Sequence, residues 1–325
     1  MNKHFNDYIS THLCLSQKDI SQSIKSREWL INAVIKKIDE QEKSPKLYSE
    51  NGKRYIPFGS YFKGTKVSDV DEFDIMLIID SNTGVYSKSG TKFGEGIGFT
   101  NPNHKYDEKF KKSDGSGVSP LKQLNWLKDI IDSVLEPYGC DPSERDGQAI
   151  TAYIKSRDLK IDFVPGGIFK KTDYPNNVFY IIPSGSNNNW IETNPRIDKA
   201  IIAGIAKDNP QFKNSIRLFK HIFKDSYNIR IGSYAVESAH VDCYSKRYFK
   251  NDFKYDFPLI LDHIRTCVQL GKIPDMRDPS INLLDTSLSM DNMISRIDKI
   301  SSIYHELNES SATLKADIFA MLSNS

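Results

Sequence analysis

An apolar run that begins with two alternating carboxylates places the strongest constraint on this chain. Residues 72–79 read Glu-Phe-Asp-Ile-Met-Leu-Ile-Ile, a composition typical of a buried strand. Side chains at positions i and i+2 point to the same face of a strand, so Glu72 and Asp74 should project together. Phe73 and Ile75 then pack inward. The run therefore predicts a core strand that presents two acids from one face.

Two carboxylates held this close repel each other, which makes it difficult to keep both of them ionised. A divalent cation between them resolves the conflict, and two Mg²⁺ ions about 3.5–4 Å apart are the usual device for in-line phosphoryl chemistry. For an isolated acid-apolar-acid triplet, an acidic turn that merely enters a strand is the commoner explanation. The surrounding sequence decides between a metal site and an acidic turn.

A third carboxylate and a Gly-Ser pair supply that context. Asp162 lies in a second predicted strand, where the alternation places Leu159 and Ile161 on the opposite face. Asp162 can therefore face the same metals, and it is a natural general base for a ribose hydroxyl. Gly59-Ser60 lies upstream of the acid pair, where a glycine lets the backbone approach a phosphate and a hydroxyl can donate to it.

Two other interpretations of this region fail. Gly59 and Gly64 have the glycine spacing of a P-loop, but Thr65-Lys66 follows where Lys and then Ser or Thr is required. A calcium-binding loop fails as well, because Phe73 occupies a ligand position and the glycine of the sixth position is missing.

The rest of the chain predicts a mixed sheet accompanied by helices, which is an α+β fold class. Residues 16–43 repeat apolar side chains at helical intervals and end before a proline, so we expect one long N-terminal spine helix. Residues 80–119 show no sustained period and predict a mobile loop or lid that could include short hairpin pieces. Further helices are predicted over 121–134, 198–206, 214–226, 233–242, 257–270 and, in pieces, 290–322, so a helical lobe follows the sheet.

The charge and the cysteine pattern exclude several classes of protein. The chain has 44 Lys and Arg against 42 Asp and Glu, whereas a protein that wraps a nucleic acid duplex usually carries a large basic excess. The four cysteines lack paired spacing, which argues against a zinc ribbon and a disulfide framework and fits a reducing cytoplasm. The sequence has neither a transmembrane stretch nor a secretion signal, so we expect a cytoplasmic protein without membrane contact.

The order of these residues resembles that of a known family. Gly-Ser, eleven residues and then Glu-Phe-Asp-Ile-Met-Leu is similar to cyclic GMP-AMP synthase and its relatives. These proteins share the nucleotidyltransferase fold of the polymerase-β superfamily with oligoadenylate synthase and the bacterial CD-NTases of anti-phage (CBASS) signalling. Residues 216–220 resemble the family helix whose lysine contacts the triphosphate. Ser233-Tyr234 resembles the serine and tyrosine that bind phosphate and stack on a base.

The resemblance implies a two-lobed nucleotidyltransferase fold and a role for each of these residues. Glu72, Asp74 and Asp162 would be the catalytic residues and would bind two Mg²⁺ ions, with Mn²⁺ able to substitute. The implied nucleotide-binding residues are Gly59, Ser60, Lys220, Ser233 and Tyr234. The implied domains are a spine helix over 1–44, a catalytic core over 45–200 and, over 201–325, a helical lobe that completes the nucleotide pocket.

The implied activity is synthesis of a cyclic di- or oligonucleotide messenger from ATP, GTP or other nucleoside triphosphates, with release of pyrophosphate. A linear oligonucleotide synthase, a transferase that modifies tRNA or protein, and a non-catalytic scaffold of the same fold are the alternatives. The animal DNA-sensing member carries a zinc insertion, whereas here the stretch from Asn228 to the helix predicted over 257–270 offers only His240 and Cys243. We therefore expect no obligatory nucleic acid, while regulatory or effector proteins stay open as partners.

Overall fold

The computed structural model describes most of the chain, which divides into two compact units. The described residues are 1–15, 17–42, 45–50, 52–67, 71–80, 85–88, 97–100, 107–115, 117–170, 178–185, 188–285, 287–309 and 320–322. The sheet unit comprises Gln17–Tyr61 and Val70–Pro195, and the helical unit comprises Met1–Ser16, Phe62–Asp69 and Arg196–Ser325. The domain boundaries implied by the resemblance stay a prediction.

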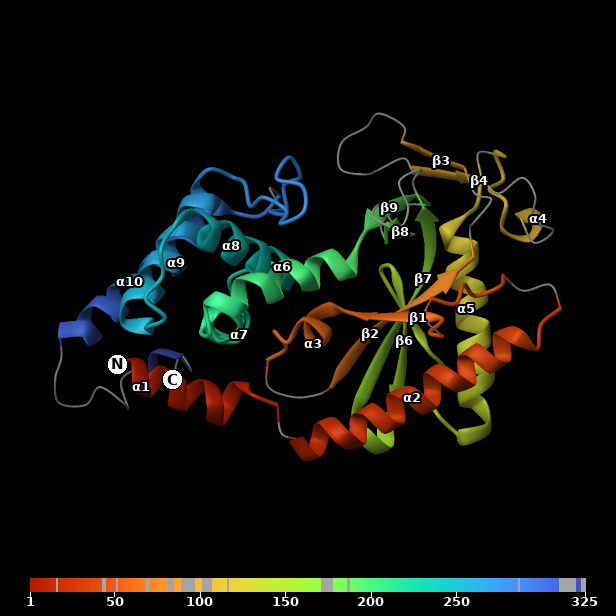
Figure 1. The fold of residues 1–325 in the computed structure, drawn as a ribbon, viewed down its shortest axis with the longest axis horizontal. Helices are drawn as coiled ribbons and strands as arrows, with labels where there is room; N and C mark the ends of the chain where they lie inside the picture. Colours follow the sequence, from red (N-terminus) through yellow and green to blue (C-terminus); the bar gives the residue numbers. More distant parts are fainter. Residues whose placement is uncertain are drawn as a thin grey trace. The chain divides into compact units, whose positions relative to one another are not determined.

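A mixed sheet forms the centre of the sheet unit (Figure 1). Its main path runs in the order β1-β2-β7-β8-β9-β4-β3, and β6 pairs with β7 on one side and β5 on the other. The strands are β1 (Tyr55–Phe58), β2 (Glu72–Ile79), β3 (Val85–Lys88), β4 (Ile97–Thr100), β5 (Glu144–Asp146), β6 (Ala149–Ile154), β7 (Leu159–Lys170), β8 (Val178–Pro183) and β9 (Trp190–Thr193). β2 and β7 pair in parallel, and the other strand pairs of the described residues are antiparallel.

Two long helices accompany this sheet. α2 (Gln17–Asp39) corresponds to the spine helix predicted over 16–43, and it packs against α5 (Pro120–Leu135), which also contacts β6 and β7 (Figure 1). α5 begins at Pro120 because the side chain of Ser119 accepts a hydrogen bond from the backbone N–H of Lys122 at 3.2 Å. The shorter helical elements are α3 (Gly59–Lys63), α4 (Asp107–Phe110) and 3₁₀ turns at Glu136–Tyr138 and Lys155–Arg157.

The alternation predicted for β2 is confirmed. Phe73 and Ile75 are buried, whereas Glu72 and Asp74 on the other face are only half-buried. Met76 continues that second face and is buried in an apolar core with side chains from β7 and β8. The two acids therefore lie where the apolar core of this face ends.

The segment predicted to be irregular, residues 80–119, is described only in part. Its described residues include β3 and β4, which pair as an antiparallel ladder, and helix α4. Residues 81–84, 89–96, 101–106 and 116 lie outside the described residues, so the lid stays a prediction.

The helical unit packs its helices around one apolar core. Its elements are α1 (Asn2–Tyr8) with a π-helical turn at Ile9–Leu13, α6 (Pro195–Asp208), α7 (Phe212–His221) with a π-helical turn at Ile222–Ser226, α8 (Ser233–Lys246), α9 (Phe253–Gln269) and α10 (Met290–Glu309). α9 begins at Phe253 rather than at residue 257, because Asp252 accepts a hydrogen bond from the backbone N–H of Lys254 at 2.9 Å. Among the described residues, no helix has the length and apolar character that a membrane span requires.

Candidate active site

Three carboxylates converge on the β2–β7 pair. The parallel register places Asp74 beside Asp162, and Glu72 beside Lys160. One oxygen from each of Glu72, Asp74 and Asp162 lies within 4.8 Å of the other two. The structure thus brings together the three acids that the sequence assigned to the metals, although they are up to 90 residues apart in the chain.

The neighbouring strands fix the direction of the Asp162 side chain. Leu159, Ile161 and Phe163 are fully buried on the opposite face of β7, as the alternation predicts. Thr151 stands opposite Asp162 in the antiparallel register of β6, and its hydroxyl donates to Oδ1 of Asp162 at 2.7 Å. This contact was not predicted, because the sequence does not show the register between β6 and β7.

The site disfavours ionisation of Asp162. Burial is the main cause and the nearby Glu72 carboxylate adds to it, so the pKa of Asp162 is raised from 3.8 to about 6 even though the Thr151 hydrogen bond lowers it. A divalent cation would remove this repulsion. The donor set consists only of carboxylate oxygens, which Mg²⁺ and Mn²⁺ prefer, so these residues fit such ions.

Binding of Mn²⁺ to this site should release a proton near pH 6. The pKa of Asp162 in the folded protein lies above its ordinary value. Between about pH 4 and 6, the folded metal-free protein therefore holds a proton that the unfolded chain has lost. The contribution of Asp162 to stability falls as the pH rises through that window. Metal binding requires the carboxylate, so calorimetry in buffers of different ionisation enthalpy should find up to about half a proton released at pH 6 and almost none at pH 8.

The control for this titration is Thr151→Val. Loss of the hydroxyl removes a contact that lowers the pKa of Asp162, so the release should move to higher pH. Equal release at pH 6 and pH 8 in the native protein would contradict the assignment of Asp162 to the metal site.

Gly59 lies beside the acids for a steric reason. Its φ is +71°, and the β1–β2 register places the preceding residue, Phe58, opposite Asp74. A Cβ added at Gly59 would lie 1.7 Å from Oδ2 of Asp74. The sequence suggested that this glycine lets the backbone approach a phosphate, and the structure adds that it makes room for Asp74. Ser60 follows it in α3 and is half-buried.

We expect Gly59→Ala to lower both stability and activity. The left-handed backbone alone should cost about 1–3 kcal/mol of stability. Displacement of the Asp74 carboxylate should also reduce the catalysed rate about 100-fold, since misplacement by about 1 Å has that effect. Gly52→Ala is the matched control, because Gly52 has φ +77° and an added Cβ there meets nothing within 4 Å. The control should lose stability and keep activity, so equal activity in the two variants would argue against the steric role of Gly59.

The helical unit carries the remaining predicted residues. Lys220 of α7 and Ser233, the first residue of α8, line one cavity of about 580 Å³. Lys224 and Arg230 line it too, and Asp285 is the acid in its wall. Cations therefore outnumber acids around this cavity, which suits a ligand that carries phosphate groups.

A buried acid that the sequence interpretation missed holds Lys220. Nζ of Lys220 lies 2.5 Å from Oε1 of Glu237, whose side chain is 1% exposed. Lys63 pairs with Oε2 of Glu237, and the Thr65 hydroxyl donates to Oε1 at 2.5 Å. Burial raises the pKa of Glu237, but Lys220 and Lys63 outweigh it and hold that pKa below its usual range. One feature of the sequence could have pointed to this pair: Glu237 lies among small and apolar residues of a predicted helix. An acid is almost never fully buried without a partner, so this position predicts a buried ion pair.

Tyr234 is the second residue of α8 and is half-buried. Its hydroxyl donates to Oδ1 of Asp198 at 3.4 Å, and the Lys63 ammonium lies 5.0 Å from the centroid of its ring. Burial raises the pKa of the phenol, so the hydroxyl stays protonated at neutral pH. The predicted stacking of Tyr234 on a base stays a prediction, as does the contact between Lys220 and a triphosphate.

Comparison with known proteins agrees with the resemblance and with the fold class. No protein-family model matches the chain. A probable cyclic nucleotide synthase of Bacillus cereus (strain VD146) is 26% identical over 303 residues, which cover 90% of this chain and 87% of that protein. Two structures of CdnC from E. coli MS115-1, one with ATP and one in complex with HORMA-deltaN, match with a TM-score of 0.69 at 15% and 14% identity. They cover the whole of this chain and 98% and 97% of the CdnC chains, so the predicted two-lobed fold is confirmed.

Proposed function

We propose, starting from the similarity of this chain to a cyclic nucleotide synthase, that it is a nucleotidyltransferase that joins nucleoside triphosphates into a cyclic di- or oligonucleotide. The observation that carries this proposal is the convergence of Glu72, Asp74 and Asp162 within 4.8 Å on adjacent parallel strands. The fold of CdnC, which was solved with ATP, supports the same class of substrate. The cyclic product would be a signal in anti-phage defence.

The three carboxylates would hold two Mg²⁺ ions, and Mn²⁺ could substitute for them. When bound, such ions neutralise phosphate charge and make a hydroxyl more acidic. Glu72 and Asp74 would hold the ions from one face of β2. Asp162 would accept the proton of the acceptor hydroxyl. The hydroxyl oxygen bonds to the α-phosphorus while the bond from that phosphorus to the pyrophosphate oxygen breaks. A second transfer of the same kind, within the growing product, closes the ring and releases another pyrophosphate.

Each of the two units would supply residues that bind the nucleotide. In the sheet unit, the proposed nucleotide-binding residues are Gly59 and Ser60. In the helical unit, Lys220 and Ser233 share their cavity with Lys224, which adds positive charge suited to a triphosphate. Tyr234 would stack on a base. CdnC has been solved in a complex with HORMA-deltaN, so we also propose a protein partner as a regulator of this chain.

The product of the nuclease-treated protein tests this proposal. After incubation with four triphosphates labelled at the α-phosphate and Mg²⁺, we expect one pyrophosphate per bond formed and a labelled product that phosphatase leaves intact. Mass analysis should find a ring without terminal phosphates. A phosphatase-sensitive chain would mean a linear synthase.

Added duplex provides the second arm of this assay. A duplex-activated enzyme makes several phosphate contacts and loses activity steeply between about 50 and 200 mM salt. The near balance of 44 basic and 42 acidic residues leads us to expect synthesis without added DNA or RNA. Activity that depends on a duplex and disappears over that salt range would contradict this expectation.

A further inference from the structure

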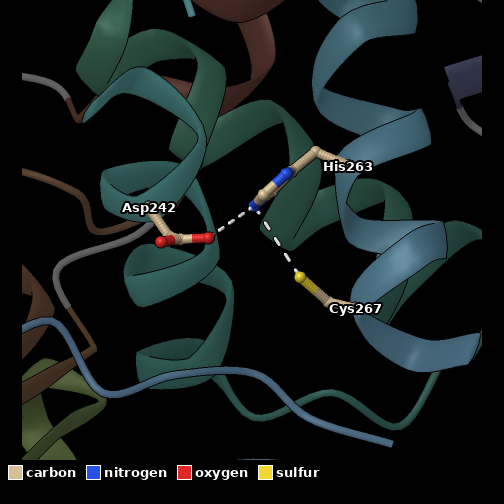
Figure 2. A group of neighbouring side chains, drawn as sticks. All are labelled: Asp242, His263 and Cys267. Atoms are coloured by element: carbon tan, nitrogen blue, oxygen red, sulfur yellow. Dashed lines mark hydrogen bonds and ion pairs between the residues drawn. The ribbon is translucent and has the colours of Figure 1, made fainter. Parts of the chain in front are cut away.

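A second group of metal-binding side chains lies in the helical unit. Asp242 of α8 and His263 and Cys267 of α9 point toward one another (Figure 2). One ligand atom of each lies within 4.8 Å of the other two. Nε2 of His263 lies 3.0 Å from Oδ2 of Asp242 and 3.7 Å from Sγ of Cys267. His263 and Cys267 are four positions apart on one helix, which places both on the same face of α9.

Both contacts of this cluster fall on a single ring nitrogen. Nε2 carries at most one hydrogen, and with it the nitrogen donates to Asp242 but offers no lone pair to the thiol of Cys267. Without that hydrogen, the thiol can donate to Nε2, and the carboxylate keeps only the hydrogen bond from Nζ of Lys246 at 2.7 Å. A single proton on Nε2 therefore serves both contacts only when it is shared between the carboxylate and the weakly accepting sulfur. A metal ion would satisfy them, because it accepts a lone pair from oxygen, nitrogen and sulfur at the same time.

We propose that Asp242, His263 and Cys267 form a zinc site, with water as the fourth ligand. Tetrahedral Zn²⁺ has bonds of about 2.0–2.3 Å, which place its ligand atoms about 3.3–3.8 Å apart. The contacts of 3.0 and 3.7 Å need only small shifts to reach this geometry. One sulfur, one imidazole nitrogen and one carboxylate oxygen form a donor set that selects Zn²⁺ over the hard ions Mg²⁺ and Ca²⁺.

The surroundings leave a route for the ion. His263 and Cys267 are 8% and 7% exposed, whereas the side chain of Asp242 is 18% exposed. The Lys246 ammonium lies 2.7 Å from both Oδ1 and Oδ2 of Asp242, and the Lys246 side chain is 61% exposed. Lys246 therefore competes for Oδ2, and metal binding requires its ammonium to shift onto Oδ1 or to turn into solvent. The charge of Lys246 weakens the site without blocking it.

Zinc at this position would link α8 to α9. α8 begins at Ser233 and Tyr234, two of the residues proposed to bind nucleotide, so the ion would stabilise the helix that carries them. This site was not predicted from the sequence. His240 and Cys243, which were weighed there as ligands, are both fully buried and are not members of the cluster. The zinc proposal does not depend on the proposed function.

Titration of the metal-free full chain with Co²⁺, followed by displacement with Zn²⁺, tests the proposal. We expect one equivalent of Co²⁺ to give the near-ultraviolet charge-transfer band of a thiolate ligand, and one equivalent of Zn²⁺ to remove it. The acidic triad contains no sulfur, so Co²⁺ bound there gives no such band. Zn²⁺ should also raise the melting temperature of the native chain.

Four variants make the test specific. Cys267→Ala should remove the band and the rise in melting temperature, and His263→Ala should weaken binding at least about 100-fold, more than the usual loss of an outer-shell partner. Asp242→Asn should keep the band with weaker binding, which guards against a loss caused only by misfolding. Cys243→Ser is the matched control and should behave like the native chain. Absence of the band in the native chain, or its persistence in Cys267→Ala, would overturn the proposal.

Discussion

Asp74→Asn is expected to abolish nucleotidyl transfer while the protein stays folded. The amide binds a divalent ion poorly, and metal stabilisation of the developing charge contributes several kcal/mol to the reaction. At 1.36 kcal/mol per factor of ten, the rate should fall at least about a thousandfold. Stability should be unchanged or higher without metal, because the substitution removes repulsion between acids that lie within 4.8 Å of one another. Pyrophosphate release and thermal melting measure the two effects.

Asp71→Asn is the matched control for that substitution. Asp71 is exposed just before β2, and its backbone oxygen already accepts a hydrogen bond from the N–H of Lys160 at 2.7 Å, which the side-chain change leaves intact. Asp71 is not one of the three converging acids, so the same loss of a carboxylate should have little effect on nucleotidyl transfer. Substantial residual activity in Asp74→Asn would remove this residue from the proposed metal site.

Glu237→Gln should destabilise the helical unit by about 3–5 kcal/mol, the usual result of breaking a buried ion pair on one side. The substitution leaves the ammonium groups of Lys63 and Lys220, which are 8% and 7% exposed, without their shared counter-charge. We expect the midpoint of denaturant unfolding to shift strongly to lower concentration.

Two further variants test the physical reason. Glu306→Gln changes an exposed acid of α10 in the same unit and should leave the midpoint unchanged. Adding Lys63→Met to Glu237→Gln should restore part of the lost stability, because it removes one of the two unpaired charges. A loss below about 1 kcal/mol in Glu237→Gln would mean that water or other groups compensate the two lysines.

The acids of the candidate site could be predicted because local patterns determine them. The alternation of Phe73 and Ile75 with Glu72 and Asp74 fixes which face each side chain occupies, and the same rule applies to Asp162 in β7. These inferences need only the period of a strand. The fold class followed from strand signals and helical periodicity, and the resemblance identified the family of folds.

What could not be predicted depends on contacts between distant segments. The parallel register that sets Asp74 beside Asp162 is a property of the sheet and not of either strand alone. Glu237 and Thr65 are 172 residues apart in the sequence, so the hydrogen bond between them cannot be predicted from the periodicity of either segment. The zinc cluster joins two helices, and only the packing of α8 on α9 brings Asp242 to His263.

In the proposed site, Glu72, Asp74 and Asp162 hold the divalent metals that act on a nucleoside triphosphate. Anomalous diffraction from crystals grown with Mn²⁺ and a non-hydrolysable triphosphate tests it most directly. The predicted result is two manganese peaks about 3.5–4 Å apart, both bound by these three carboxylates and by phosphate oxygens. Nucleotide bound with manganese elsewhere, and with the three carboxylates free of metal, would contradict the claim.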